Sequence, residues 1–230
     1  MTALLDSWRL LARSVSNRLR FRFGTAANGV RYRELPYVFF IGFNRTATRS
    51  IHRLFVLQGI PSVHWHKNRI VLRMLRNITR GRKILSGYDS QYLVFSDVIL
   101  ATEKILIEGN SFFRELYRDY PGSLFVLNTR PTQKWIKSRV RQKGGDFLRR
   151  QLLLLSTQDS EVALKLWENQ KNRHEEDVRS FFSNKPEQFL EIDIEAVDFV
   201  EKLSSKLPYK LNSENWQVVG RSANSVISEI

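Results

Sequence analysis

Five short runs rich in apolar residues predict strands, and the first of them lacks alternation, as in a strand that is buried on both faces of a sheet. They cover residues 37–41, 62–65, 92–95, 123–127 and 189–194. Between and after these runs, apolar residues recur at helical spacing, which predicts helices over residues 51–55, 69–83, 98–106, 110–118, 132–140, 162–182 and 197–207. This alternation predicts an α/β fold, a single domain with a central parallel sheet flanked by helices.

The loop after the first apolar run is rich in hydroxyl groups and positive charge. Gly42 ends the run, and the loop then carries the hydroxyls and guanidinium groups of Thr46, Thr48, Ser50, Arg45 and Arg49. Hydroxyls and backbone N–H groups at a helix N-terminus, together with fixed cations, bind anions such as phosphate. We therefore predict a P-loop-like strand-loop-helix anion site. The alternative is that Thr48 or Ser50 only caps the helix and the arginines are solvated.

A second strand-turn-helix follows later in the chain. The apolar run 123–127 leads into Asn128, Thr129, Arg130 and Pro131, and a helix is predicted over 132–140. A proline in the first turn is a helix-start signal, so Arg130 lies at the carboxyl end of the strand. Ser138 stands eight residues further on, two turns into the helix.

Two residues are candidates for a catalytic base. His66 and Asp97 each follow a predicted strand, and ligands of open α/β sheets bind outside the carboxyl ends of the strands. Asp97 is equally well explained as the N-cap of a helix over 98–106. We interpret His64, inside its apolar run, as buried structure.

The N-terminal segment has an amphipathic pattern. Residues 1–24 carry apolar side chains at spacings of three and four, interleaved with arginines. Such a basic helix packs on its own domain or on a second copy, or lies on an anionic membrane surface. Residues 24–29 predict a flexible break. We therefore divide the chain into an N-terminal helix and linker (1–35), an α/β domain (36–210) and a C-terminal tail (211–230).

Composition narrows the partner and the compartment. The 37 Lys and Arg against 23 Asp and Glu give a net charge of +14, which favours anionic ligands. The basic residues are spread over the chain and no nucleic-acid module is recognised, so nucleic acid is not the expected partner. The absence of cysteine excludes disulfides and thiolate ligands, and four histidines leave little for a metal site. No apolar run reaches bilayer length and no secretory signal is evident, so we expect a cytoplasmic protein without a metal.

With these two elements the chain resembles the sulfotransferase family, whose members transfer a sulfuryl group from 3′-phosphoadenosine 5′-phosphosulfate (PAPS) and release 3′-phosphoadenosine 5′-phosphate (PAP). The resemblance rests on residues 45–50 and on the spacing of Arg130, Pro131 and Ser138, and extends loosely over residues 36–210. Ala47 stands where the family usually has Gly, and Arg45 where it usually has Lys.

The resemblance implies roles for the matching residues. Arg45, Thr46, Ala47, Thr48, Arg49 and Ser50 would hold the 5′-phosphosulfate, and Arg130 and Ser138 the 3′-phosphate. Arg45 would also offset charge on the leaving group, and Asp97 or His66 would deprotonate the acceptor hydroxyl.

Two other functions fit the same residues. One is a phosphate-loop nucleotide kinase, although the chain has no G-x-x-x-x-G-K-[ST] segment. The other is a non-catalytic binder of nucleic acid or an acidic polymer. The sequence does not identify the acceptor; glycans, lipids, peptides and small alcohols all fit.

Overall fold

The computed structural model describes residues 10–18 and 32–218. Its centre is a five-stranded, all-parallel sheet in the order β2-β3-β1-β6-β7. The strands are β1 (Val38–Phe40), β2 (Ser62–His64), β3 (Val94–Ser96), β6 (Leu124–Thr129) and β7 (Phe189–Asp193). Each lies within or next to one of the five apolar runs, so the predicted α/β fold is confirmed.

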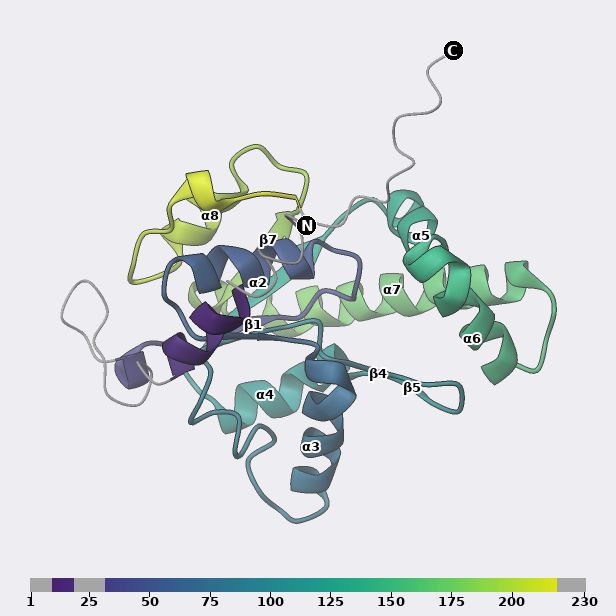
Figure 1. The fold of residues 1–230 in the computed structure, drawn as a ribbon, viewed down its shortest axis with the longest axis horizontal. Helices are drawn as coiled ribbons and strands as arrows, with labels where there is room; N and C mark the ends of the chain where they lie inside the picture. Colours follow the sequence, from purple (N-terminus) through teal and green to yellow (C-terminus); the bar gives the residue numbers. More distant parts are fainter. Residues whose placement is uncertain (1–9, 19–31, 219–230) are drawn as a thin grey trace.

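Helices connect the strands and cover both faces of the sheet (Figure 1). The α-helices are α2 (Thr48–Leu57), α3 (Arg69–Ile78), α4 (Phe113–Asp119), α5 (Thr132–Val140), α6 (Asp146–Leu154), α7 (Ser160–Phe182) and α8 (Phe199–Ser205). Short 3₁₀ turns are η1 (Tyr32–Glu34), η2 (His66–Asn68), η3 (Gly109–Phe112), η4 (Gln142–Gly145), η5 (Pro186–Gln188) and η6 (Ser213–Asn215). The predicted bounds of α5 are confirmed at both ends.

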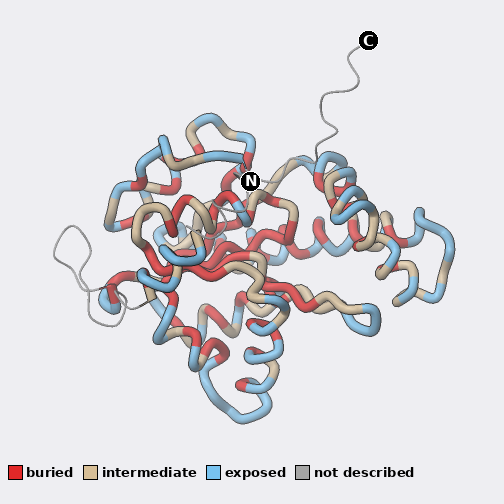
Figure 2. The backbone as a smooth tube through the Cα atoms, viewed as in Figure 1, coloured by how far each residue is buried: buried red, intermediate tan, exposed pale blue. Residues whose placement is uncertain are grey.

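The central strand β1 divides its side chains between two cores. Val38 and Phe40 join the cluster that includes side chains of α2 and α8. Phe39, together with Ile41 directly after the strand, joins the cluster that includes side chains of α3, α4 and α7. Because successive side chains of a strand point to opposite faces, an unbroken apolar run is what a strand covered on both sides requires. Figure 2 shows this buried centre as a continuous red band.

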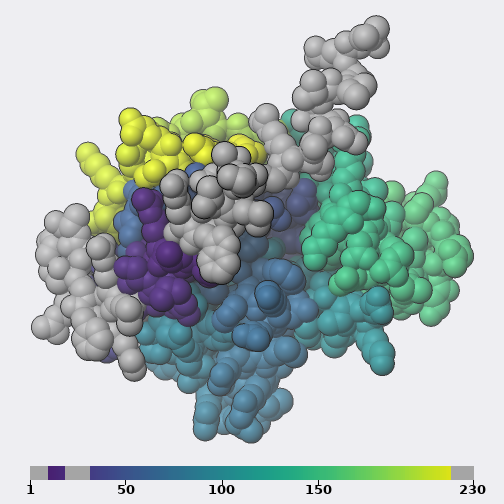
Figure 3. All heavy atoms as spheres, viewed as in Figure 1, coloured from purple at the N-terminus to yellow at the C-terminus, as the bar shows by residue number. Residues whose placement is uncertain are grey.

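A third apolar cluster lies beside the sheet. Trp135 of α5, Phe147 of α6 and Trp167 of α7 pack together with Phe43, from the loop after β1. The lobe formed by α5, α6 and α7 is the green region at the right of Figure 3. This cluster joins the lobe to the loop after β1.

The predicted helix over residues 98–106 is wrong. The chain there forms an antiparallel hairpin of β4 (Ile99–Ala101) and β5 (Leu106–Glu108). Val98, Ile99, Ile105 and Ile107 are β-branched, and the Thr102 hydroxyl accepts the N–H of Ile105 at 3.1 Å, which closes the turn. Asp97 therefore caps no helix.

The N-terminal prediction is tested only in part, because the predicted break at 24–29 lies outside the described residues. Residues 10–18 are helical, and the Asn17 side chain is buried and donates to Val56 O at 3.0 Å. Leu11 and Val15 of this helix remain 56% and 43% exposed. In the tail, Trp216 stacks on Phe199 with ring centroids 4.3 Å apart. Over residues 10–18 and 32–218, no helix combines the length and apolarity needed to cross a bilayer.

We predict that Gly42→Ala destabilises the protein by about 2–3 kcal/mol. A Cβ at this position would lie 1.9 Å from the backbone oxygen of Asn128, so the ends of β1 and β6 would have to separate. Urea unfolding measures the cost.

Gly81→Ala is the matched control. Its Cβ meets no atom within 4 Å, and only the left-handed backbone (φ +60°) is strained. Because Gly→Ala also reduces the entropy of the unfolded chain, its net cost should be about 1 kcal/mol, less than that of Gly42→Ala. Equal costs for the two variants would show that the close approach at Gly42 carries no special constraint.

Candidate functional site

One large cavity, with a volume of ≈ 830 Å³, opens at the carboxyl ends of the strands. Its lining comes from the loop after β1, the start of α2, the ends of β2 and β3, helix α5, the loop after β7 and the tail. The lining residues are Asn44, Arg45, Ala47, Thr48, Arg49, His64, Asp97, Arg130, Lys134, Lys137, Ser138, Arg141, Gln142, Ile194, Glu195, Ala196, Val197, Trp216 and Val218. This is the edge where open α/β sheets bind ligands.

The two anion elements predicted from the sequence meet in this cavity. Arg45 Nε donates to Ser138 Oγ at 3.0 Å, and Arg130 Nη1 lies 3.5 Å from Arg45 O. The guanidinium from the first loop thus touches the hydroxyl of the second element. Burial, and then the nearby charges of Arg49 and Arg130, lower the pKa of Arg45 below its usual value.

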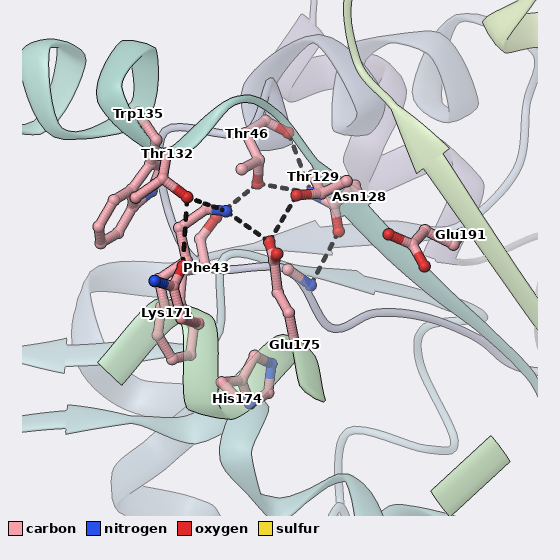
Figure 4. Close-up of polar contacts among 12 residues, drawn as sticks. Phe43, Thr46, Asn128, Thr129, Thr132, Trp135, Lys171, His174, Glu175 and Glu191 are labelled. Atoms are coloured by element: carbon pink, nitrogen blue, oxygen red, sulfur yellow. Dashed lines mark hydrogen bonds and ion pairs between the residues drawn. The ribbon is translucent and has the colours of Figure 1, made fainter. Parts of the chain in front are cut away.

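The Asn128 side chain ties the two elements together. Its Oδ1 accepts the N–H of Gly42 at 2.9 Å. Its Nδ2 donates to Thr46 O at 3.0 Å and to Thr46 Oγ1 at 2.7 Å. Figure 4 shows this amide between the Thr46 loop and the end of β6. Asn128 is fully buried, so the bridge is shielded from water.

A buried ion pair on α7 supports the turn that carries Arg130. Lys171 Nζ lies 2.7 Å from Glu175 Oε1 and donates to Thr132 Oγ1 at 3.2 Å. Thr129 Oγ1 donates to the same carboxylate oxygen at 2.5 Å (Figure 4). The residues on both sides of Arg130 and Pro131 are thereby fixed to α7.

The start of α2 has a strained backbone. Arg45 and Ala47 adopt left-handed conformations with φ of 71° and 56°. Trp135 Nε1 holds the loop by donating to Asn44 O at 2.7 Å. Ala47 therefore takes up the backbone conformation for which Gly is normally favoured. Such strain clusters at functional sites.

Arg130 has a carboxylate partner inside the cavity. Arg130 Nη2 lies 2.8 Å from Glu195 Oε1, and Lys134 Nζ lies 2.6 Å from Glu195 Oε2. Hydrogen bonding from Lys134, together with the charge of Arg130, lowers the pKa of Glu195. The Glu195 carboxylate is thus ionised at neutral pH. It occupies the position next to Arg130 and Lys134 at which another anion could pair with them.

The third polar group of the cavity is Asp97. Its Oδ2 lies 3.2 Å from Nε2 of His64, whose Nε2 is also 3.2 Å from Thr48 Oγ1. Burial raises the pKa of Asp97 to about 6, although Arg49 and Arg45 oppose that rise. Burial, with Arg49, lowers the pKa of His64 to about 4. Near pH 7 an ionised carboxylate therefore faces a neutral imidazole.

The predicted site residues divide into two groups. Arg45, Ala47, Thr48, Arg49, Asp97, Arg130 and Ser138 line the cavity. The other three predicted residues, Thr46, Ser50 and His66, are not among the lining residues. Thr46 and Ser50 are buried, and Thr46 Oγ1 donates to Phe43 O at 2.5 Å. His66 Nδ1 lies 2.7 Å from the Tyr88 hydroxyl.

Sequence reasoning missed several contributors, among them His64, Asn128, Lys134 and Glu195. His64 and Asn128 are polar residues at the carboxyl ends of β2 and β6, and that position was the available signal. Lys134 and Glu195 gave no local signal, because α5 and the loop after β7 come together only in the fold. Within residues 10–18 and 32–218, no cluster of three or more His, Cys, Asp or Glu side chains is arranged to hold a metal ion.

The comparisons with known proteins place the chain in a family. The family model of the sulfotransferase domain matches residues 37–168, which is more than half of the chain. The matched region includes Arg45, Asp97, Arg130 and Ser138. No curated protein matches the sequence. With both anion elements inside the match and both lining one cavity, the chain belongs to the sulfotransferase family.

Proposed function

We propose that the cavity binds PAPS and that the protein transfers its sulfuryl group to an acceptor hydroxyl or amine. The observation that carries this proposal is the meeting of two distant sequence elements, since Arg45 touches Ser138 and lies beside Arg130 in one cavity. A nucleotide with phosphates at both ends of its ribose needs two such cationic groups within one site.

The residues present fit such a nucleotide. Ligand cavities commonly span about 300–1,000 Å³, and this one measures ≈ 830 Å³. Arg130 Nε and Asn44 Oδ1 are buried and have no hydrogen-bond partner among the described residues. Buried polar atoms are normally paired, so both are suited to bind a ligand.

The N-terminus of α2 is the proposed site of the 5′ end. Arg45, Thr48 and Arg49 line the cavity there, and the helix dipole adds positive potential. Thr46 and Ser50 support the loop from within, because their side chains are buried. Ala47 adopts a positive φ in the structure. An alanine can therefore hold this loop in shape, although the conformation costs it some strain.

The turn before α5 and the cavity side of that helix are the proposed site of the 3′-phosphate. Arg130 and Ser138 are its ligands, and Lys134 and Lys137 add positive charge on the same helix. Arg130 is a fixed cation with a planar fork of donors, which suits a phosphate.

When bound, PAPS supplies the sulfuryl group and PAP is the product. Arg45 would stabilise negative charge on the leaving oxygen, and Asp97 would accept the proton of the acceptor hydroxyl. We prefer Asp97 to His66 as the base, because Asp97 lines the cavity and His66 does not. Positioning and charge stabilisation, rather than covalent chemistry by the protein, would account for the rate.

We predict that Arg130→Ala weakens PAP binding about 10- to 100-fold, the usual effect of losing a hydrogen bond to a charged group. Arg45→Ala should lower turnover more than it lowers PAP affinity. Calorimetric titration with PAP and turnover of labelled PAPS in an acceptor screen separate these effects.

Arg76→Ala is the matched control, because it removes one exposed charge from α3, outside the cavity. Its PAP affinity should equal that of the unaltered protein. A protein that binds Mg·ATP but not PAP would overturn the proposal in favour of a kinase-like enzyme, and salt-sensitive polymer binding without PAP binding would favour the non-catalytic alternative.

We predict that Glu195→Gln tightens PAP binding by about 3- to 10-fold. The substitution frees Arg130 and Lys134 from an internal carboxylate that competes with phosphate. Asp198→Asn removes the same charge from the following turn, where Asp198 pairs with Lys202 at 3.0 Å, and should leave the affinity unchanged. Weaker binding by Glu195→Gln would instead show that Glu195 orients Arg130 for the ligand.

We predict that Asp97→Asn lowers turnover about 10²- to 10⁴-fold and leaves PAP binding intact. The base must be ionised, and its pKa is raised to about 6, so kcat/KM should rise with pH up to about 6 and then level off. A pH profile of PAPS turnover tests this. Full activity of Asp97→Asn, or a profile without an acid limb near pH 6, would exclude Asp97 as the base.

A further inference from the structure

The imidazole of His64 joins two parts of the cavity that the proposed mechanism treats separately. His64 ends β2, and its Nε2 lies 3.2 Å from Asp97 Oδ2 and 3.2 Å from Thr48 Oγ1. Asp97 follows β3, whereas Thr48 begins α2. One side chain thus contacts both the proposed base and the proposed anion loop.

The carboxylate of Asp97 has little else to hold it. Its Oδ1 is buried without a hydrogen-bond partner among the described residues. Its backbone is in the left-handed region, with φ of 56°, so the residue is strained. Among residues 10–18 and 32–218, the side chain that contacts this carboxylate is His64, whose Nε2 lies 3.2 Å from Oδ2.

The protonation states give that contact a direction. An ionised carboxylate only accepts hydrogen bonds, and a neutral imidazole carries one N–H. With Asp97 ionised and His64 neutral near pH 7, a hydrogen on Nε2 would be donated to Oδ2, 3.2 Å away. An imidazole with its hydrogen on Nδ1 would instead set two acceptors 3.2 Å apart.

The charged and titratable groups around this pair come from several elements. Arg45 in the first loop, Arg49 on α2 and Arg139 on α5 all favour the ionised form of Asp97. His52, on α2, faces His64 with ring centroids 5.8 Å apart, and burial lowers its pKa to about 3. His52 is therefore neutral as well and adds no charge at neutral pH.

We propose that His64 is a positioning residue, which donates Nε2–H to Asp97 Oδ2 and so holds the base ionised and oriented beside the anion loop. The inference rests on the proposed role of Asp97 and extends it. A hydrogen bond to the charged form of an acid favours that form, so His64 opposes the effect of burial on Asp97.

The direct test is a carboxyl ¹³C NMR titration of Asp97 in the ligand-free protein, with the resonance assigned by Asp97→Asn. His64→Leu fills a similar volume without an N–H, and should raise the pKa of Asp97 by about one to two units. His64→Gln keeps a donor and should stay within about half a unit of the unaltered protein. In turnover of labelled PAPS, His64→Leu should lose 10-fold or more in kcat while its affinity for PAP is kept.

His52→Leu is the matched control, because it removes a neighbouring buried imidazole whose Nδ1 contacts Ser62 Oγ at 2.9 Å. It should leave the titration of Asp97 unchanged, whatever it does to the melting temperature. An unchanged titration of Asp97 in His64→Leu would overturn the proposal.

A measurement on the unaltered protein covers the case in which His64→Leu does not fold. The imidazole ¹⁵N shifts of His64 should report the Nε2–H tautomer, and the Nδ1–H tautomer would overturn the proposal. If the unaltered protein does not bind PAP, the proposed function is wrong. If His64→Leu changes the titration of Asp97 but keeps full turnover, the proposed function stands and only the role of His64 is wrong.

Discussion

The buried amide of Asn128 is the interaction on which the rest of the site depends. Its two ends bond to Gly42 N–H and to both oxygens of Thr46, so the loop after β1 is fixed to the end of β6. The backbones approach so closely there that position 42 has no room for a Cβ. The distance between the two elements is therefore set by the sheet itself.

Helix α5, which carries Ser138 and Lys137, is held by a buried cation outside the cavity. Arg139, next to Ser138, is fully buried and lies 4.7 to 4.9 Å from the ring centroids of Trp135, Phe147 and Trp167. It also pairs with Glu108 of the β4–β5 hairpin at 2.5 Å. Buried charges need both pairing and packing, and here they join α5, α6 and α7 to the hairpin. The lobe thus presents Ser138 and Lys137 from a helix that is fixed on its inner side.

Backbone strain marks the same edge of the sheet. The loops after β1, β2 and β3 contain seven non-glycine residues with positive φ, namely Arg45, Ala47, Trp65, His66, Lys67, Asn68 and Asp97. Each such residue costs of order 1 kcal/mol or more, which the packed sheet beneath them can offset. Arg45 and Asp97, two of these residues, line one cavity, and the sheet supports the irregular loops that carry them.

The sequence could locate the two elements that line the cavity because their signals are local. An apolar run followed by Arg45 to Ser50, and Arg130 followed by Pro131 and Ser138, can be recognised without knowledge of the fold. The sequence analysis chose His66 rather than His64, because it extended the second strand to Trp65, whereas β2 ends at His64. The turn after β2 depends partly on a distant contact: Trp65 Nε1 donates to Asn68 Oδ1, and Asn68 Nδ2 donates to Ala101 O. The helix expected over 98–106 failed because β-branched residues and a threonine turn favoured a hairpin. Glu195 could not be predicted from the sequence, because it lies 65 residues from Arg130 along the chain and the two side chains meet only in the fold.

The most direct test of the central claim, that the two elements form one nucleotide site, is a crystal structure of the protein with PAP. The account predicts a single PAP in the cavity, with its 3′-phosphate on Arg130 and Ser138, its 5′-phosphate at residues 45–49, and Glu195 displaced from Arg130. A PAP molecule bound elsewhere, or one that contacts only one of the two elements, would contradict it.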